Sequence, residues 1–385
     1  MFSKIKKIPL SSISFGSYGT SRLFLCSIVL LFSTSVYALD GIIRPYQSVR
    51  SAAMGGVRMT TGLYDENFFN NPARVTANPA SEFTLIQITP IETTSNTIKE
   101  ISSISNGNDP LKSLTNNAGK NIHDRLQIVL PAFYWAATEE RKLAFALGMI
   151  TSLQIDADIR QSYQTSLDGI LDIGPTLTIG RKFLAHDELS IGINTHLTYR
   201  VGTSPNFSLV DYVRGSSLGI KSIGGEGSMI DFDLGSTYKL GEWNNFVLSM
   251  GGAIQNILGG NYSNLKFTPL KIGSLPPAQP RSYGLGVSVT RSSWVFFTDT
   301  ALAFEVTDIH NNPDGSVFKL LHLGGETHWK SFAFRAGLNQ GYWTAGLGID
   351  FRFITLDLAS YGEEMGLNAG TLEDRRYTLN LGLHI

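Results

Sequence analysis

"LAFALGMITSLQIDADI" (residues 143–159) alternates apolar residues with small or polar ones. Its odd positions read Leu, Phe, Leu, Met, Thr, Leu, Ile, Ala and Ile, whereas its even positions read Ala, Ala, Gly, Ile, Ser, Gln, Asp and Asp. A period of two places successive side chains on opposite faces of a β-strand. The run is also longer than the roughly five or six residues usual for a strand of a soluble protein. It therefore predicts a long strand with one apolar face and one small or polar face.

The same alternation recurs along the chain and ends in "RRYTLNLGLHI" (375–385). Its phase changes between Phe351 and Ile354, which a tight turn at that point would explain. The first and the tenth patterns are the weakest. We expect fourteen strands, at 82–91, 125–137, 142–157, 169–183, 187–202, 228–240, 244–258, 281–291, 294–308, 316–329, 331–340, 342–352, 353–361 and 375–385.

The connections between these strands alternate in length. Short links join the second strand to the third, the fourth to the fifth, and so on, whereas most of the other links are long. The short ones include 138–141, 184–187, 241–244 and 291–293, and the long ones are 92–124, 158–168, 203–227, 259–280, 309–315 and 362–374. Short turns at one end and long loops at the other are typical of bacterial outer-membrane β-barrels. An even number of strands would place both termini at the short-turn, periplasmic end.

Lipid cannot satisfy backbone N–H and C=O groups, so only helices and closed sheets cross a membrane. A soluble β-sandwich would also alternate, but it would need shorter strands and fewer apolar faces turned outward. After residue 38 no apolar run reaches the roughly 18 residues of a membrane helix. The sequence therefore predicts an all-β fold, a 14-stranded antiparallel transmembrane β-barrel over residues 82–385 with an N-terminal hatch, or plug, segment. Aromatic residues near strand ends on the outer face fit an interfacial belt: Phe183, Tyr199, Trp294, Trp343, Phe351 and Tyr377.

The first residues predict export. Lys4, Lys6 and Lys7 precede the apolar run "LFLCSIVLLF" (23–32). Ala38 provides the small residue expected just before a cleavage site. This layout is that of a secretory signal peptide, residues 1–38. The single cysteine falls inside it, so we expect no disulfide or thiol chemistry in the mature chain. We expect the mature barrel in the outer membrane of a Gram-negative-type bacterium, with membrane lipids as partners. Lys+Arg number 31 against 32 Asp+Glu, and this balance gives no sign of a nucleic-acid partner.

Residues 39–81 precede the first strand and show no convincing period. A barrel of this size encloses a wide lumen. A segment of this length at the short-turn end is the right size and in the right place to fold inside it as a hatch. Gly55 and Gly56 would permit positive φ or close backbone approach. Asn71 before Pro72 favours an extended or turn backbone.

Two parts of this segment, "SVRSAAMGG" (48–56) and "NNPAR" (70–74), resemble the N-terminal segment of the FadL/TodX-type hydrophobic-compound transporters and of related PorV-type barrels. The run "FRAGLNQGYWTAGLGIDF" (334–351) is similar to the C-terminal part of the same superfamily. The resemblance implies a fourteen-stranded barrel with an N-terminal hatch and a kink in one strand that opens the wall sideways. By motif, it places Asn71, Pro72 and Ala73 in the hatch, after the glycine-containing stretch.

The leading functional hypothesis is passive transport of hydrophobic, fatty-acid-like small molecules across the outer membrane. A transporter needs an apolar pocket near the hatch, for which Leu63, Phe68 and Phe69 are the candidate lining residues. The alternative is a PorV-like scaffold or shuttle barrel whose partners are secretion or envelope-assembly proteins. A general porin is a third hypothesis and would need an aqueous channel past the hatch.

Candidate chemical sites are weak. His322, Glu326 and His328 share one strand face, but the two histidines are six residues apart, roughly 20 Å along a strand. That spacing is too long for one metal ion. Ser190 and His196 share an inward face at the same separation, and no nucleophile–base pair is evident. We expect no catalytic, metal or cofactor site and no enzymatic activity.

Overall fold

The structure is a computed structural model. It describes residues 44, 46–99, 120–159, 164–203, 206–208, 224–265, 272–311, 316–351, 353–366 and 368–385. The chain divides into two compact units, Met1–Asp40 and Gly41–Ile385, and all described residues belong to the second. The expected signal peptide, residues 1–38, lies outside the described residues. None of the described helices is both long and apolar enough to cross a membrane.

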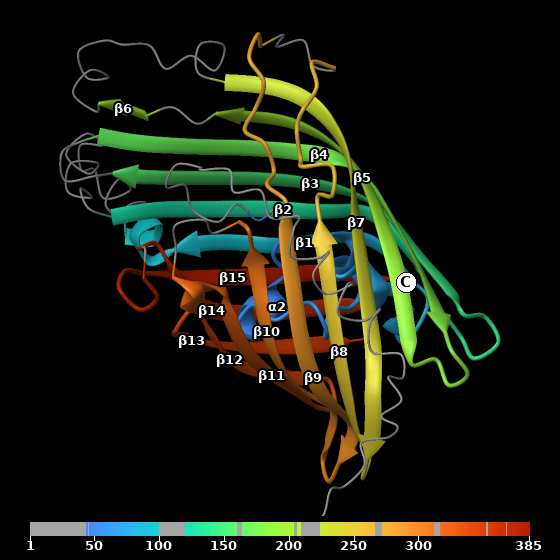
Figure 1. The fold of residues 1–385 in the computed structure, drawn as a ribbon. Coiled ribbons are helices and arrows are strands. Elements are labelled where there is room, and N and C mark those ends of the chain that lie inside the picture. The colour runs from blue at the N-terminus through green and yellow to red at the C-terminus, as the bar shows by residue number, and fades with distance from the viewer. Residues whose placement is uncertain are drawn as a thin grey trace, which may run out of the picture. The chain divides into compact units, whose positions relative to one another are not determined.

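The described strands form one antiparallel sheet that closes on itself (Figure 1). Each long strand pairs with the next along the chain, β1 pairs with β15, and the β3–β4 pairing completes the ring. The prediction of a closed, antiparallel, 14-stranded barrel is confirmed. The short β6 adds to the edge of β4. The strands are β1 (Glu82–Thr94), β2 (Lys120–Trp135), β3 (Leu143–Ile159), β4 (Gln164–Phe183), β5 (Leu189–Thr203), β6 (Asn206–Ser208), β7 (Gly224–Trp243), β8 (Phe246–Gln255), β9 (Ser282–Trp294), β10 (Phe297–Ile309), β11 (Leu321–Trp329), β12 (Phe332–Asn339), β13 (Tyr342–Phe351), β14 (Ile354–Glu364) and β15 (Glu373–His384).

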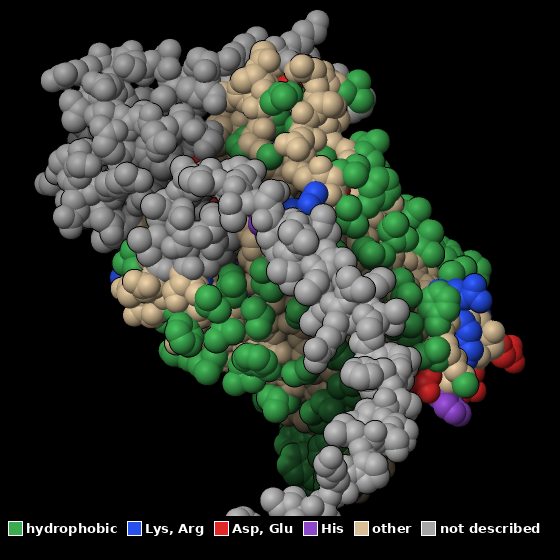
Figure 2. All heavy atoms as spheres, viewed as in Figure 1, with side chains coloured by type: hydrophobic (Ala, Val, Ile, Leu, Met, Phe, Trp, Pro, Cys, Tyr) green, Lys and Arg blue, Asp and Glu red, His purple; other side chains and the backbone are tan. Residues whose placement is uncertain are grey.

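Polar and apolar side chains are distributed over the barrel in the opposite way to a soluble protein. Leu147, Leu302 and Leu347 on the outer face are each more than half exposed. On the inner face, Asn194 and Glu305 are fully buried. Figure 2 shows hydrophobic side chains covering much of the outer surface of the strands in view. An apolar exterior around a polar interior is the arrangement that a lipid-embedded barrel requires.

Three details of the strand pattern concern turns and loops. β13 ends at Phe351 and pairs there with Ile354 of β14, so the phase change coincides with a tight turn, as predicted. The predicted strand 316–329 is partly wrong, because its first residues form the 3-10 helix η3 (Val317–Leu320). Ser316 caps this helix by accepting a hydrogen bond from the amide of Phe318, and this local bond competes with strand pairing.

Tyr199 is an exception to the predicted outer-face belt, because it is buried. It packs with Val201 and with Ile272, which comes from the connection between β8 and β9. Its hydroxyl donates to Glu226, whose other carboxylate oxygen accepts from the Ile272 amide. A loop thus covers this part of β5, whereas the other five predicted belt aromatics are exposed.

Residues 44 and 46–81, the described part of the segment that we continue to call the hatch, contact the inner face of the barrel wall. The described elements of the hatch are the helix α2 (Val49–Ala53) and two 3-10 helices, η1 (Tyr64–Phe68) and η2 (Pro72–Ala77). Ser48 caps α2 by accepting a hydrogen bond from the amide of Ser51. α2 contacts β12 to β15, whereas η2 contacts β3, β4, β5 and β7. The two ends of the hatch therefore contact different sides of the wall.

A charge introduced on the outer face tests whether this face of the sheet contacts lipid. Leu302 lies near the middle of β10 with its side chain exposed on the outer face. We expect Leu302→Arg to lower the free energy of unfolding in lipid vesicles by about 2–4 kcal/mol, because a guanidinium near the bilayer midplane must be desolvated. Denaturant unfolding in vesicles measures the change, and Leu302→Ala is the control for lost side-chain area. If the arginine variant were no less stable than the alanine variant, this face would not contact lipid.

Candidate functional site

The Gly55–Gly56 pair lies against the wall where β11, β12 and β13 meet. Their φ values are 68° and 87°, a region that favours glycine. A Cβ atom on Gly55 would lie 2.3 Å from the carbonyl oxygen of Leu323, and one on Gly56 would lie 2.6 Å from Nδ1 of His322. The Gly55 amide donates to Oγ1 of Thr344 at 3.0 Å, and its carbonyl accepts from Nδ1 of His322 at 2.7 Å. Both glycines are thus needed for backbone conformation and for close approach to the wall.

The Asn71-Pro72-Ala73 motif lies on the other side of the lumen. The side-chain oxygen of Asn71 accepts from the Ala73 amide, and its nitrogen donates to the carbonyls of Met59 at 2.7 Å and of Ser236 in β7 at 3.0 Å. Asn71 and Ala73 are fully buried. The motif fits over two wall glycines, because a Cβ atom on either would lie within 3 Å of Asn71, Pro72 or Ala73: Gly192 and Gly235. Asn71 therefore joins two parts of the hatch to each other and to the barrel.

A buried carboxylate binds the middle of the hatch. The carboxylate of Glu305, on β10, accepts hydrogen bonds from three successive backbone amides, those of Arg58 at 2.6 Å, Met59 at 2.8 Å and Thr60 at 2.9 Å. The hydroxyl of Thr60 adds a fourth donor at 2.9 Å. Hydrogen bonds to an ionised acceptor are stronger than neutral ones. Glu305 therefore fixes residues 58–60 against the wall.

Two arginines of the hatch, Arg44 and Arg58, form buried ion pairs with the wall. Arg44 contacts Asp308 at 3.0 Å and Glu363 at 2.6 Å, so it bridges β10 and β14. Arg58 shares Asp308 at 2.8 Å. Truncating one partner of a buried pair leaves the other charge uncompensated, which is strongly destabilising. These contacts oppose any movement of the hatch as a rigid body.

Arg50, on α2, connects the hatch to itself and to the wall. Its guanidinium contacts Glu66 of the hatch and Glu326 of β11, each at 2.8 Å. Glu326 also pairs with Arg335, which in turn contacts Asp357 at 2.5 Å. Burial alone would lower the pKa of Arg50, but the carboxylates of Glu326 and Glu66 raise it, so the guanidinium stays charged. Glu326, considered above as a metal ligand, thus pairs with two arginines.

The Glu305 contact can be weakened without changing the shape of the side chain. We expect Glu305→Gln to accelerate hydrogen exchange at the amides of residues 58–60 by roughly 30-fold, because about 2 kcal/mol of charge-assisted bonding is lost. Hydrogen exchange read by mass spectrometry on the refolded barrel measures this. Glu242→Gln, at an exposed acid near the end of β7, is the matched control. Unchanged protection in the Glu305 variant would show that this carboxylate does not hold the hatch.

A cavity of about 950 Å³, here called the vestibule, lies between the hatch and the short-turn end of the barrel. Leu63, Asp65 and Arg74 line it from the hatch, and Lys330 and Asp350 line it from the wall. Its lining mixes polar and apolar surface and carries charges of both signs. Leu63 is half-buried here, so this predicted ligand-lining residue borders the vestibule and not the smaller cavity described below.

Asp65 is a buried acid at the edge of the vestibule. One of its carboxylate oxygens has no hydrogen-bond partner among the described residues. Burial, with a smaller contribution from the nearby charge of Glu66, raises the pKa of Asp65 well above its usual range. A raised pKa means that the folded state binds this proton more tightly than the unfolded state does. Asp65 therefore stabilises the hatch at low pH, and this contribution is lost as the pH rises through the folded-state pKa.

The direction of this pH dependence can be tested by replacing Asp65 with a neutral side chain of the same size. We expect Asp65→Asn to increase protection of the hatch amides from hydrogen exchange at pH 8, and to have little effect near pH 4, where the acid is already neutral. Exchange rates at the two pH values, corrected for intrinsic chemistry, give the comparison. A variant less protected than the original chain at pH 8 would contradict the assignment.

A second, smaller cavity lies on the other side of the hatch. Its volume is about 20 Å³, enough for a single water molecule. Phe69 borders it and stacks on Tyr46 with ring centroids 5.7 Å apart. The remaining lining comes from four strands of the wall, β3, β4, β5 and β7, and from the β8–β9 connection: Ile150, Ser152, Asp172, Ile173, Gly174, Pro175, Thr176, His196, Thr198, Arg200, Met229, Asn256, Tyr262 and Gln279. Phe68, the neighbouring predicted lining residue, is instead fully buried in a cluster with residues of β2 and β3.

The wall beside this cavity has an interrupted ladder. Between β4 and β5 the pairing passes from Ile173–Tyr199 to Thr176–His196, which leaves Gly174 and Pro175 out of the ladder. Proline has no N–H to donate and is unusual in the interior of a sheet. A Cβ atom on Gly174 would lie 1.7 Å from the carbonyl oxygen of Leu197, so β5 approaches the glycine closely. We call Gly174, Pro175 and the facing residues 197–198 the ladder break.

The β8–β9 connection folds into the barrel over the same cavity. Arg200, on the inner face of β5, donates to the carbonyl of Pro277 at 3.0 Å and lies 5.0 Å from the ring centroid of Tyr262. Another part of the connection pairs with the edge of β7 that β8 is too short to reach, through Ser263 and Ser228. The proline-rich run 274–280, which the sequence indicated only as a loop, is partly buried: Pro276 and Gln279 are buried, whereas Ser274 pairs with the edge of β7 and is exposed.

Together these features define a transmembrane β-barrel that contains a hatch, with a cavity on each side of the hatch. A comparison with protein families finds no match, and a comparison with curated proteins finds none either. Among solved structures, the Ralstonia pickettii toluene transporter TbuX has a TM-score of 0.48 and 12% identity, covering 91% of this chain and 98% of that chain. The Pseudomonas putida toluene transporter TodX has a TM-score of 0.45 and 12% identity, covering 90% and 98%. A Pseudomonas aeruginosa FadL homologue has a TM-score of 0.36 and 11% identity, covering 90% and 99%.

The predicted resemblance to FadL/TodX-type barrels is therefore confirmed as a similarity that extends over most of the chain. At these TM-scores and identities the similarity carries no weight in assigning an activity or a substrate. The chemistry of this barrel has to be read from its own residues.

Proposed function

We propose that this chain allows hydrophobic small molecules to cross an outer membrane passively, leaving sideways through the wall at the ladder break. The observation that carries the proposal is the position of the smaller cavity, which is bordered by Phe69 of the hatch and by Gly174 and Pro175 of the wall. A molecule held there would have apolar contacts inside and lipid directly outside. We further propose that the hatch comprises residues 39–81 and carries the motif Gly55, Gly56, Asn71, Pro72 and Ala73.

The chemistry of the cavity favours a neutral, apolar ligand. Phe69, Met229 and Tyr262 supply aromatic and apolar surface. The one arginine in the lining, Arg200, is already paired with Asp172 through two hydrogen bonds of 2.7 Å. A guanidinium neutralised in this way offers little to a charged ligand. Because the cavity is small as it stands, entry of a ligand requires the β8–β9 connection or Phe69 to move.

A sideways exit fits the hatch better than an axial one. The hatch is bound to three strands of the wall: Arg44 pairs with β10 and β14, Arg50 pairs with β11, and Glu305 of β10 binds the middle of the hatch. The two cavities share no lining residue among those described, so the hatch lies between them. An apolar molecule that passed the hatch would enter the vestibule, whose lining carries charges of both signs. At the ladder break it would instead reach the lipid-facing surface at once.

A reversible cross-link across the break tests this route. Pro175 and Leu197 are opposite each other in the register of β4 and β5, and Cys26 lies in the expected signal peptide. We expect cells producing a Pro175→Cys/Leu197→Cys variant to take up a radiolabelled neutral hydrocarbon several-fold more slowly when the disulfide is formed. Reduction should restore the original rate.

The matched control is Ile179→Cys/Ile193→Cys, an outward-facing pair on the same two strands away from the break. It should form its disulfide without changing uptake. If sealing the break left uptake unchanged in a folded barrel, the sideways route would be wrong. If the uncross-linked barrel took up no more than cells lacking it, transport itself would be refuted, and the scaffold hypothesis would be the one to pursue.

A further inference from the structure

The turns at the short-turn end differ between the two halves of the barrel. The β2–β3 and β4–β5 turns carry charged or ionisable residues, which we call the charged rim: Glu139, Glu140, Arg141, Lys142, His186, Asp187 and Glu188. Figure 2 shows charged side chains gathered at the tips of these hairpins. The next four turns carry bulky apolar residues, which we call the aromatic rim: Trp243, Trp294, Val295, Phe296, Trp329, Phe332, Phe351 and Phe353.

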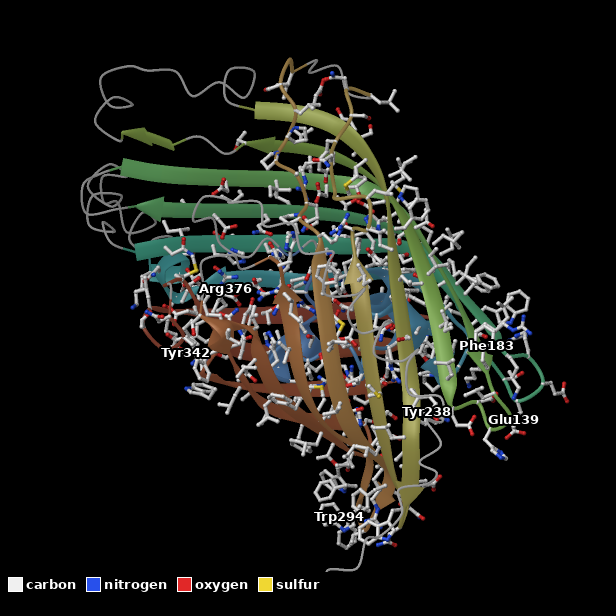
Figure 3. All side chains as sticks on the ribbon, viewed as in Figure 1. Glu139, Phe183, Tyr238, Trp294, Tyr342 and Arg376 are labelled. Atoms are coloured by element: carbon white, nitrogen blue, oxygen red, sulfur yellow. The ribbon has the colours of Figure 1, made fainter. Side chains whose placement is uncertain are left out.

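Three residues of the aromatic rim are among the most exposed apolar side chains of the described chain. Trp243, at the end of β7, and Val295, in a turn, are 79% exposed, and Phe296, in the same turn as Val295, is 77% exposed, although polar residues are usual in turns. Figure 3 shows Trp294 and Glu139 at the tips of different hairpins. Tyr342 and Arg376 lie far from them, at the opposite end of the barrel. Apolar side chains that project this far from a folded chain are unfavourable in water.

The composition of the aromatic rim matches a membrane interface. Tryptophan is enriched where acyl chains meet headgroups. Two cations accompany the rings: the Arg291 guanidinium lies 4.7 Å from the ring centroid of Phe246, and the Lys330 ammonium lies 5.3 Å from that of Trp329. Such cations can bind headgroup phosphates while their stems lie along apolar surface.

We propose that the aromatic rim is embedded in the headgroup–acyl boundary of the leaflet at the short-turn end, while the charged rim stands in water. Lipid is the occupant that the geometry favours, because the rim continues the lipid-facing surface through Leu240, Leu248 and Leu302. It also extends over four successive hairpins, which suits a planar medium better than a single protein groove. The barrel consequently sits deeper in the bilayer along β7–β14 than along β2–β5. This inference does not depend on the proposed transport.

Depth can be measured at one position on each rim. Phe296→Cys and Glu140→Cys variants, each carrying a nitroxide, are reconstituted in vesicles of phosphatidylethanolamine and phosphatidylglycerol. We expect the label at 296 to collide preferentially with oxygen, which dissolves in lipid, and the label at 140 with a water-soluble nickel chelate. The ratio of the two collision rates should differ at least five-fold between the sites. A label at Leu302→Cys gives the value for full lipid contact.

Equal exposure of the 140 and 296 labels to nickel would overturn the proposal, and would mark the aromatic rim as a surface for a soluble partner. A second measurement avoids engineered cysteines. Brominated lipids should quench the tryptophan fluorescence of the unsubstituted barrel, and Trp294→Phe should remove part of the quenched signal. A Trp294→Phe variant that lost only unquenched signal would also refute lipid contact.

Discussion

The closed sheet follows from one constraint: a backbone surrounded by lipid has no water to bond with, so each strand must find two neighbours. The sheet meets this constraint by closing through β3–β4 and β1–β15. Closure then divides the side chains into an outer set that needs to be apolar and an inner set that surrounds a lumen. The inner set is polar, and without a filling it would leave a wide opening. The hatch supplies that filling, and its charged and amide groups satisfy the inner wall. Carboxylates such as Glu305 and Glu326 are stable inside the barrel because the hatch brings donors to them.

The hatch and the wall therefore form one hydrogen-bonded unit, and the hatch is not a separate body that merely fills the lumen. Arg44 joins two strands through the hatch, and Arg50 joins two parts of the hatch to a third strand. Removing any one charge leaves another buried without a partner, so the network is held together cooperatively. In the wall, the β4–β5 pairing is interrupted at Gly174–Pro175, although both residues still pair with β3, and along β7 a loop replaces the missing part of β8. A firmly bound hatch and interrupted pairing in the wall are what the proposed sideways route would require.

Much of the fold could be predicted from the sequence because strand alternation is a local property. The run 143–159 and the phase change at Phe351 each determine their own neighbourhood, and the strands follow them. Long-range packing could not be predicted in this way. The pairing of Arg44 with Asp308 joins residues 264 positions apart, and no local pattern identifies it. Tyr199 has the parity of an outward residue, and only the return of Ile272 from a distant loop buries it. The motif residues of the hatch were visible as glycines and an Asn-Pro step, but their wall contacts were not.

The order along the chain of the residues that join the hatch to the wall has a consequence for biogenesis. The hatch is made first, whereas the partners of Arg44 and Arg50 stand on β10, β11 and β14, near the end of the chain. Until those strands arrive, the basic side chains must remain hydrated and the hatch cannot adopt its final contacts. Because a barrel closes sideways but stays open at its ends, the hatch could reach these partners either while the sheet curls or afterwards. In either order, the contacts of Arg44 are complete only once β14 has joined the sheet.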